Sequence, residues 1–169
     1  MKYVPQPVQG SLFRPPYRFI FDANVIFSQN PELQPYPRSV NSEMWKRIDE
    51  LVKEQVIVTC GQIAREVESR DDFAHQWFET CGIKVIEEDE SIQRKVKLVV
   101  NDHPNMLKFR ATKTSSGDAF LIATAIEHDL IIVTQEKKTS PIKIPQIAAC
   151  YGVQSVNLME FCEMQGWSF

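Results

Sequence analysis

Five short apolar segments alternate along the chain with longer segments whose apolar residues recur at helical spacing, and this alternation is the strongest constraint on the fold. The short segments span 18–22, 56–59, 83–87, 130–134 and 153–157. The segment LIIVT at 130–134 is apolar on both faces, as a strand inside a parallel sheet is. Strands that alternate with helices predict right-handed crossovers, with helices on both faces of the sheet. The sequence therefore predicts an α/β fold of three layers, α/β/α, around a central, mainly parallel sheet.

The patterned part of the chain begins near Tyr17, and the residues before it are rich in proline and carry no periodicity. We interpret residues 1–17 as an N-terminal arm and residues 18–169 as a single domain. The chain has 169 residues, of which 43% are hydrophobic, and this is enough for one core of ordinary size. Three prolines between residues 29 and 41 predict a loop there, because proline interrupts both helices and strand ladders.

Helical patterns fill the intervals between the predicted strands. The first predicted helix begins at about Ser42. The others span 61–81, 89–109, 114–129, 144–152 and 158–166. The helix over 61–81 either continues or breaks near Asp71. His103-Pro104 stops the next helix, because the residue before a proline disfavours helical geometry. The segment 114–129 is almost wholly apolar after a polar start, which predicts a helix in the interior.

Several classes of protein are disfavoured by composition. No run of 18 apolar residues is present, and the N-terminus lacks the apolar stretch of a signal peptide, so we expect a soluble, cytoplasmic protein without a membrane partner. The four cysteines and three histidines follow no zinc-site spacing, and we interpret the cysteines as reduced, mostly core residues. The net charge of -3 does not by itself indicate nucleic-acid binding. Basic stretches at 94–97, 108–110 and 137–138 are either solvated faces or phosphate contacts.

Four carboxylates fall near the ends of predicted strands or at the helices that follow them. They are Asp22, Glu66, Asp118 and Glu136. Because functional groups of open parallel sheets collect at the carboxyl ends of the strands, these side chains are candidates to converge. Several carboxylates brought together repel one another unless divalent cations neutralise them, which predicts a Mg²⁺ or Mn²⁺ site. Asn24 and Thr134 are expected to support the water network around it.

Each carboxylate also has a purely structural interpretation, which the sequence leaves open. The alternatives are a helix cap for Asp22 with Asn24, an i,i+4 ion pair with Arg70 for Glu66, a first-turn acid after Ser115 for Asp118, and a turn acid beside Lys137-Lys138 for Glu136. For Asp22 the capping role alone is the weaker explanation, because Ser or Thr caps a helix without burying a charge.

The order of these motifs resembles a PIN domain. The segments that carry the resemblance are FIFDANVIF (19–27), QIAREVES (62–69), GDAFLIATA (117–125) and IIVTQEKK (131–138). The likeness covers about residues 18–160. DDFAHQWFE (71–79) and the ending PIKIPQIAACYGVQSVNLMEF (141–161) are similar, more narrowly, to a bacterial and archaeal PIN subfamily without an assigned function.

The resemblance implies a PIN-like fold and a metal-dependent endoribonuclease that hydrolyses RNA phosphodiester bonds. It implies that Asp22, Glu66 and Asp118 are the core metal-binding acids and that Glu136 is the fourth, at a position where the family often has Asp. Many such proteins are VapC-like toxins of type II toxin-antitoxin modules, which implies an antitoxin partner and a homodimer. For the RNA we expect contacts from the 29–40 loop and from the region of Lys95 to Arg110, where Lys108 and Arg110 are the residues to test.

Two other interpretations are compatible with the sequence. One is a catalytically silent PIN-like module that serves binding or assembly, against which the retention of the core acids argues. The other is an unrelated doubly wound domain, against which the lack of glycine-rich nucleotide-binding motifs argues.

Overall fold

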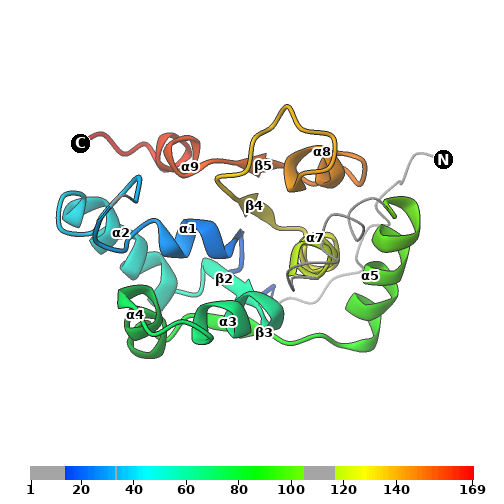
Figure 1. Ribbon diagram of the computed structural model, residues 1–169, viewed down its shortest axis with the longest axis horizontal. Helices are drawn as coiled ribbons and strands as arrows, with labels where there is room; N and C mark the ends of the chain where they lie inside the picture. The colour runs from blue at the N-terminus through cyan, green and yellow to red at the C-terminus, as the bar shows by residue number, and fades with distance from the viewer. Residues whose placement is uncertain (1–13, 33, 105–116) are drawn as a thin grey trace.

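A parallel sheet with helices on both faces forms the centre of the computed structural model, which describes residues 14–32, 34–104 and 117–169 (Figure 1). The strands are β1 (Phe19–Phe21), β2 (Ile57–Cys60), β3 (Lys84–Ile86), β4 (Ile131–Val133) and β5 (Ser155–Val156). Their order across the sheet is β3-β2-β1-β4-β5, and each pairing is parallel. This confirms the three-layer α/β/α architecture and the five strands that the sequence predicts.

The central strand β1 is buried over its whole length, because it pairs with β2 on one side and with β4 on the other. Its register sets Phe19 opposite both Ile57 and Ile131, and Phe21 opposite Val133. The residues directly after β1 and β4 are therefore neighbours at the carboxyl edge of the sheet. Asp22 is the first residue beyond β1 and accordingly lies beside the end of β4.

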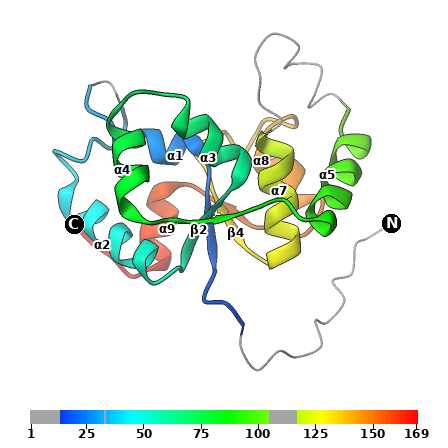
Figure 2. The ribbon, with the colours of Figure 1, turned by 90° about the horizontal axis from the view of Figure 1, so that it is seen from below.

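Helices cover the two faces of the sheet in separate groups (Figures 1 and 2). On one face lie α2 (Ser42–Lys53), α4 (Phe73–Cys81) and α9 (Leu158–Met164). On the other face lie α5 (Glu90–Asp102), α7 (Gly117–His128) and α8 (Ile144–Ala149). The apolar helix α7 packs against the sheet, and α5 covers it from outside, so α7 occupies the interior as its sequence predicts.

Two further helices lie at the carboxyl edge, where the strands end (Figure 2). They are α1 (Ala23–Phe27), which follows β1 directly, and α3 (Gly61–Glu68), which follows β2 directly. These helices pack against each other, and α3 also packs against α7. The edge of the sheet is thereby enclosed by the first turns of helices that follow its strands.

The predicted helix over 61–81 is two helices. The chain leaves helical geometry after Glu68 and starts again at Phe73, with Asp72 as the N-cap whose side chain accepts the His75 N–H at 3.0 Å. The helix therefore breaks near Asp71, because the Asp72 side chain caps the start of a second helix. α5 ends at Asp102, before His103-Pro104, while residues 105–109 of that predicted helix lie outside the described ranges.

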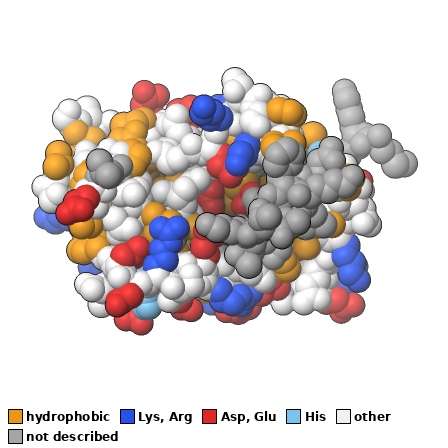
Figure 3. Space-filling model, viewed as in Figure 1, with side chains coloured by type: hydrophobic (Ala, Val, Ile, Leu, Met, Phe, Trp, Pro, Cys, Tyr) orange, Lys and Arg blue, Asp and Glu red, His pale blue; other side chains and the backbone are white. Residues whose placement is uncertain are grey.

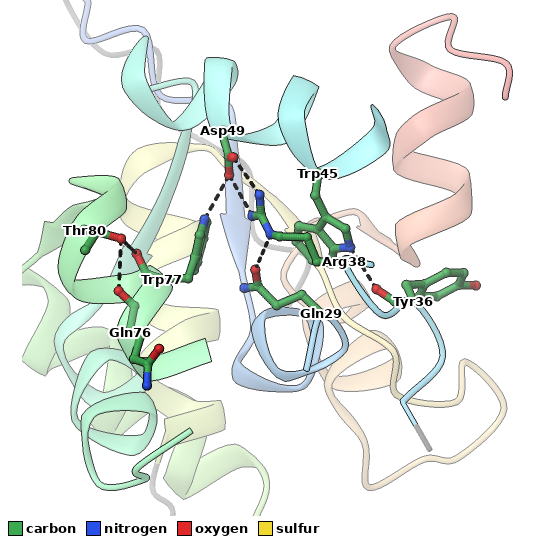
Figure 4. A network of polar contacts seen from close by, with 8 residues as sticks. All are labelled: Gln29, Tyr36, Arg38, Trp45, Asp49, Gln76, Trp77 and Thr80. Atoms are coloured by element: carbon green, nitrogen blue, oxygen red, sulfur yellow. Dashed lines mark hydrogen bonds and ion pairs between the residues drawn. The ribbon is translucent and has the colours of Figure 1, made fainter. Parts of the chain in front are cut away.

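The proline-containing loop before α2 is held in place by one arginine (Figure 4). Arg38 makes two hydrogen bonds of 2.7 and 2.9 Å to the Asp49 carboxylate, and its Nε donates to Gln29 Oε1 at 3.1 Å. Trp77 Nε1 donates to the same carboxylate at 2.9 Å, and the Arg38 guanidinium lies over the Trp45 ring, 5.5 Å from its centroid. The loop is thus anchored to two helices, α2 and α4.

Two expectations from composition concerned the state of the cysteines and the membrane. All four cysteines lie in the described ranges and are free thiols, with Cys60 and Cys162 buried, Cys81 half-buried and Cys150 exposed. Among the described residues, no helix has both the length and the apolar character needed to cross a membrane.

Candidate metal and active site

Asp22 lies where β1 ends and α1 begins, and its side chain is 5% exposed. One carboxylate oxygen, Oδ1, accepts the Ala23 N–H at 2.8 Å, and the other, Oδ2, accepts the Thr134 hydroxyl at 2.8 Å. Asp22 is therefore the N-cap of α1, as one structural alternative supposed. The second hydrogen bond reaches across to the segment after β4, which a cap does not require.

Thr134 is the centre of a small polar network that joins α1 to the segment after β4. Its hydroxyl donates to Asp22, and the same oxygen accepts from Asn24 Nδ2 at 3.3 Å and from the Glu136 N–H at 3.2 Å. Asn24 Oδ1 in turn accepts the Gln135 N–H at 3.1 Å. A hydroxyl has one hydrogen and two lone pairs, so this arrangement uses the whole hydrogen-bonding capacity of Thr134 and holds Asp22 in one orientation.

The buried position of Asp22 makes its carboxyl weakly acidic. Burial raises the pKa of Asp22 from 3.8 to about 7, while the hydrogen bonds from Thr134 and Ala23 act in the opposite direction. The negative charges of Glu136 and Glu66 contribute to this rise in the pKa, after burial. Three of the four predicted carboxylates therefore act electrostatically on one site, at a place where a cation would relieve their repulsion.

Glu66 and Asp118 approach the same edge from α3 and α7. Glu66 is half-buried on α3, and Asp118, in the first turn of α7, is 8% exposed. Figure 3 shows acidic side chains in a hollow at the middle of the face above the strand ends, with Lys and Arg side chains around it. The capping partner proposed for Asp118, Ser115, lies outside the described ranges.

Glu136 is engaged in holding the start of α8. Its Oε2 accepts the Ile144 N–H at 2.8 Å, and its Oε1 lies 3.9 Å from Lys143 Nζ. The side chain is 15% exposed, so these contacts are partly shielded from water. The interpretation as a plain turn acid therefore understates its role, because Glu136 ties the turn after β4 to the next helix.

The donor set fits a divalent cation held by few protein ligands. Within the ranges that the structure describes, no three His, Cys, Asp or Glu side chains are grouped so that they could hold a metal ion together. Mg²⁺, however, is usually bound by one or two carboxylates and keeps several waters. Each Asp22 oxygen accepts one hydrogen bond and retains a further lone pair toward such an ion.

Two residues that support the site were not predicted from sequence. Gln135 donates its backbone N–H to Asn24, and its side-chain Oε1 accepts the Leu158 N–H at 3.1 Å, which fixes the start of α9. Thr59 Oγ1 donates to the Phe21 carbonyl at 3.0 Å and so fixes the end of β1. The only signal in the sequence was a polar residue within or just after an apolar strand segment. Of the region expected to contact RNA, residues 95–102 belong to α5, whereas residues 105–110, with Lys108 and Arg110, lie outside the described ranges.

A family model matches almost the whole chain. Residues 19–169 match the model described as "Domain of unknown function (DUF4411)". No curated protein matches the sequence.

Solved structures share the fold at low sequence identity. PAE2754 from Pyrobaculum aerophilum superposes with a TM-score of 0.54 at 14% identity, over 95% of this chain and 99% of that chain. FitAcB from Neisseria gonorrhoeae superposes with a TM-score of 0.51 at 17% identity, over 83% of this chain and 98% of that one. FitAB bound to an IR36 DNA fragment gives 0.51 at 16% identity, over 83% and 94%. These likenesses show the fold, which is PIN-like, as the resemblance predicted.

Proposed function

The chain belongs to the family described as a domain of unknown function, DUF4411, and from this premise and its PIN-like fold we propose that it is a metal-dependent endoribonuclease. The observation that carries the proposal is Asp22. Its carboxyl is buried at the carboxyl edge of the sheet, in the field of Glu66 and Glu136, with its pKa raised to about 7. A buried carboxylate with a raised pKa costs the fold stability once it is ionised, although it accepts two hydrogen bonds, and this cost points to a cation that the group serves to bind.

We assign the metal-binding role to Asp22, Asp118 and Glu66, with Mg²⁺ or Mn²⁺ as the ion. When bound, the ion would neutralise charge on the phosphodiester and make a water more acidic. Thr134 donates to Asp22 and is itself held by Asn24, so the carboxylate that would bind the ion has a fixed orientation. Glu136 acts through water and not by direct coordination, because both of its oxygens face other groups: Oε2 accepts the Ile144 N–H, and Oε1 lies 3.9 Å from the Lys143 ammonium.

The chemistry proposed for this site is hydrolysis of an RNA phosphodiester by in-line attack of water. A P–O bond forms to the water oxygen and the P–O bond to the leaving ribose oxygen breaks. The water proton passes to a carboxylate or to solvent, and the leaving oxygen takes a proton from solvent. The half-buried Glu66 and the buried Asp118 are the acids positioned to orient that water, since both lie on helices that surround the strand ends.

A second candidate function is a PIN-like module that binds or assembles without cleaving. The engagement of Glu136 with α8 favours it, as does the lack of a three-ligand group among the described side chains. The raised pKa of Asp22 argues for the nuclease, because in a site without a cation a neutral hydrogen-bonding residue would cap α1 without burying a charge.

The test is cleavage of structured and single-stranded RNA, with single-stranded DNA alongside, by the purified protein in Mn²⁺, Mg²⁺ or EDTA. We expect metal-dependent cutting of RNA that Asp22→Asn and Asp118→Asn both abolish while remaining folded. Cutting that survives in both variants would indicate a contaminating nuclease and would contradict the proposal. No cutting by the wild type, together with no metal-induced rise in melting temperature, supports the silent module instead.

The partner proposal rests on the resemblance to VapC-like toxins. We propose that the chain is the toxin of a toxin-antitoxin pair, that it binds a small antitoxin protein and that it forms a homodimer. FitAB, a solved structure of the same fold, is bound to a DNA fragment, which is compatible with a toxin-containing complex acting at DNA. Light scattering of the purified chain, alone and co-expressed with the product of the adjacent gene, tests both statements. A monomer that recruits no such product contradicts them.

A further inference from the structure

An open cleft of about 440 Å³ lies beside the acidic site, and the proposed nuclease does not yet explain it. Three segments form its walls: the loop before α2, the turn after β4 and the start of α9. Residues that line it include Pro35, Tyr36, Glu136, Lys137, Lys138 and Met159. A volume of this size is within the range of clefts that hold small ligands or single groups of larger ones.

The cleft and the acidic site share a wall. Glu136 lines the cleft, and its backbone N–H donates to Thr134, the residue that holds Asp22. Gln135, which also lines the cleft, donates its backbone N–H to Asn24. A nucleic-acid strand with one phosphodiester at Asp22 would therefore have a neighbouring nucleotide at the cleft.

Tyr36 offers that nucleotide an aromatic surface. Its side chain is half-buried and points away from the network around Arg38 (Figure 4). Its backbone is fixed on both sides, because its N–H donates to the Ser28 carbonyl at 3.2 Å and its carbonyl accepts Trp45 Nε1 at 2.8 Å. The half-buried side chain of Tyr36 also packs against the hydrophobic core. The loop thus presents a ring that is partly ordered before any ligand arrives, which reduces the entropic cost of stacking.

The lysines of the cleft differ in their availability. Lys138 Nζ lies 2.7 and 2.5 Å from the two carboxylate oxygens of Glu160, so its charge is already compensated. Lys137 is exposed and, within the described ranges, pairs with no carboxylate. One positive charge beside the aromatic wall is therefore available to a phosphate.

We propose that this cleft binds one unstacked base of a single-stranded RNA segment, with the base on the ring of Tyr36 and the adjoining phosphate at Lys137. The inference rests on the proposed nuclease function, whose site it extends by one nucleotide. A single strand is the expected form, because the bases of a duplex remain stacked and paired and cannot turn their faces to a side chain. The stack tolerates different bases, since each has a π-face.

The test measures binding without cleavage. A fluorescently labelled single-stranded RNA is titrated with Asp22→Asn protein, and gel analysis confirms that the RNA stays intact. Into this background we place Tyr36→Phe, Tyr36→Leu and Tyr36→Ala. Phe keeps the aromatic face, Leu keeps the apolar packing without it, and Ala removes both.

We expect Tyr36→Phe to bind within about twofold of its parent. Tyr36→Leu and Tyr36→Ala should bind about five- to 150-fold more weakly, the range for loss of one base–aromatic stack. The loss should disappear when the RNA carries an abasic site at one particular position, and it should be small for duplex RNA. Lys137→Gln should lower the slope of log affinity against log salt by about 0.7, and the exposed Lys53→Gln should leave it unchanged.

Equal binding by the three Tyr36 variants overturns the inference, and so does the absence of measurable RNA binding by the parent. Failure of the nuclease proposal gives a different result. A wild type that does not cleave, but whose binding still depends on the aromatic face at position 36, would keep the cleft and remove the hydrolysis. A wild type that cleaves, with all Tyr36 variants equal in binding, would keep the hydrolysis and remove the cleft.

Discussion

Among single residues, Asp22 matters most for the proposed function. Its carboxylate follows a strand whose three residues are fully buried, and burial is the largest cause of its raised pKa. A neutral hydrogen-bonding residue at this position would cap α1 without a desolvation penalty. The negative fields of Glu66 and Glu136 add to that penalty. Two predictions follow at this scale, one on Asp22 and one on Glu136.

The first prediction concerns how the stability of the fold changes with pH when EDTA keeps divalent cations away from the site. Because the folded pKa of Asp22, about 7, lies above the unfolded value of 3.8, the folded state binds more protons between these values and loses stability as the pH rises. Relative to Asp22→Asn, the wild type should therefore lose about 3–4 kcal/mol of unfolding free energy between pH 4 and pH 8. Urea unfolding of both proteins across this window measures the change. A difference that stays constant with pH would contradict the raised pKa.

The second prediction separates the two roles of Glu136, which are its hydrogen bond to α8 and its charge near the site. In Glu136→Gln the side-chain oxygen still accepts the Ile144 N–H, so we expect little change in melting temperature. The charge near the site is lost, and cleavage should fall by about tenfold, the effect of removing a group that acts through others at a metal site. Glu136→Ala should show the same loss of activity and, in addition, about 1 kcal/mol of destabilisation. Abolition of cleavage by Gln, as in Asp22→Asn, would indicate direct metal binding instead.

At the scale of elements, the carboxyl edge is built from strands that end side by side and helices that start there. α1 and α3 begin within two residues of the ends of their strands, so Asp22 lies directly at the carboxyl edge and Glu66 stands only two turns of helix from it. The loop before α2 has no regular structure of its own, and its position depends on Arg38 and Asp49. This dependence makes the loop, and Tyr36 within it, sensitive to a change on α2.

We expect Asp49→Asn to destabilise the protein by about 1–3 kcal/mol, because it removes the charge that accepts two Arg38 hydrogen bonds and one from Trp77. The matched control is Glu43→Gln on the same helix, whose ion pair with Arg47 is exposed and should contribute less than about 0.5 kcal/mol. Urea unfolding of the three proteins makes the comparison. Equal effects would mean that the Arg38 network does not anchor the loop.

At the scale of the whole molecule, a bound cation should act as a stabilising ligand of the native state. With Mn²⁺ at about 100 times its dissociation constant, the gain is about 2.7 kcal/mol, or a rise of roughly 5–10 °C in melting temperature for a chain of this size. Asp22→Asn should lose the rise. Asp129→Asn, an exposed change at the far end of α7, should keep it. A rise that persists in Asp22→Asn would place the ion elsewhere.

Much of the architecture followed from local patterns. The sequence predicted the strand segments at 18–22 and 130–134, the interior position of α7 and the end of α5 before His103-Pro104. Each depends on a pattern within a few residues: apolar residues on both faces, helical periodicity or a proline. Helix α1 was not predicted as an element. Its five residues are too few to show a helical period, and only the cap at Asp22 indicates it.

The sequence by itself determined which residue types stand at the ends of the strands, and so which chemistry the edge can support. It could not determine their partners. That Thr134 holds Asp22 depends on the register of β1 with β4, across 112 positions of chain. Glu136 accepts the first N–H of α8, and Tyr36 lines a cleft beside Glu136. Both depend on how the turn after β4 packs against its neighbours in the fold. Hydrogen bonds and fields act through space, so only the tertiary structure decided which of the predicted groups share a site.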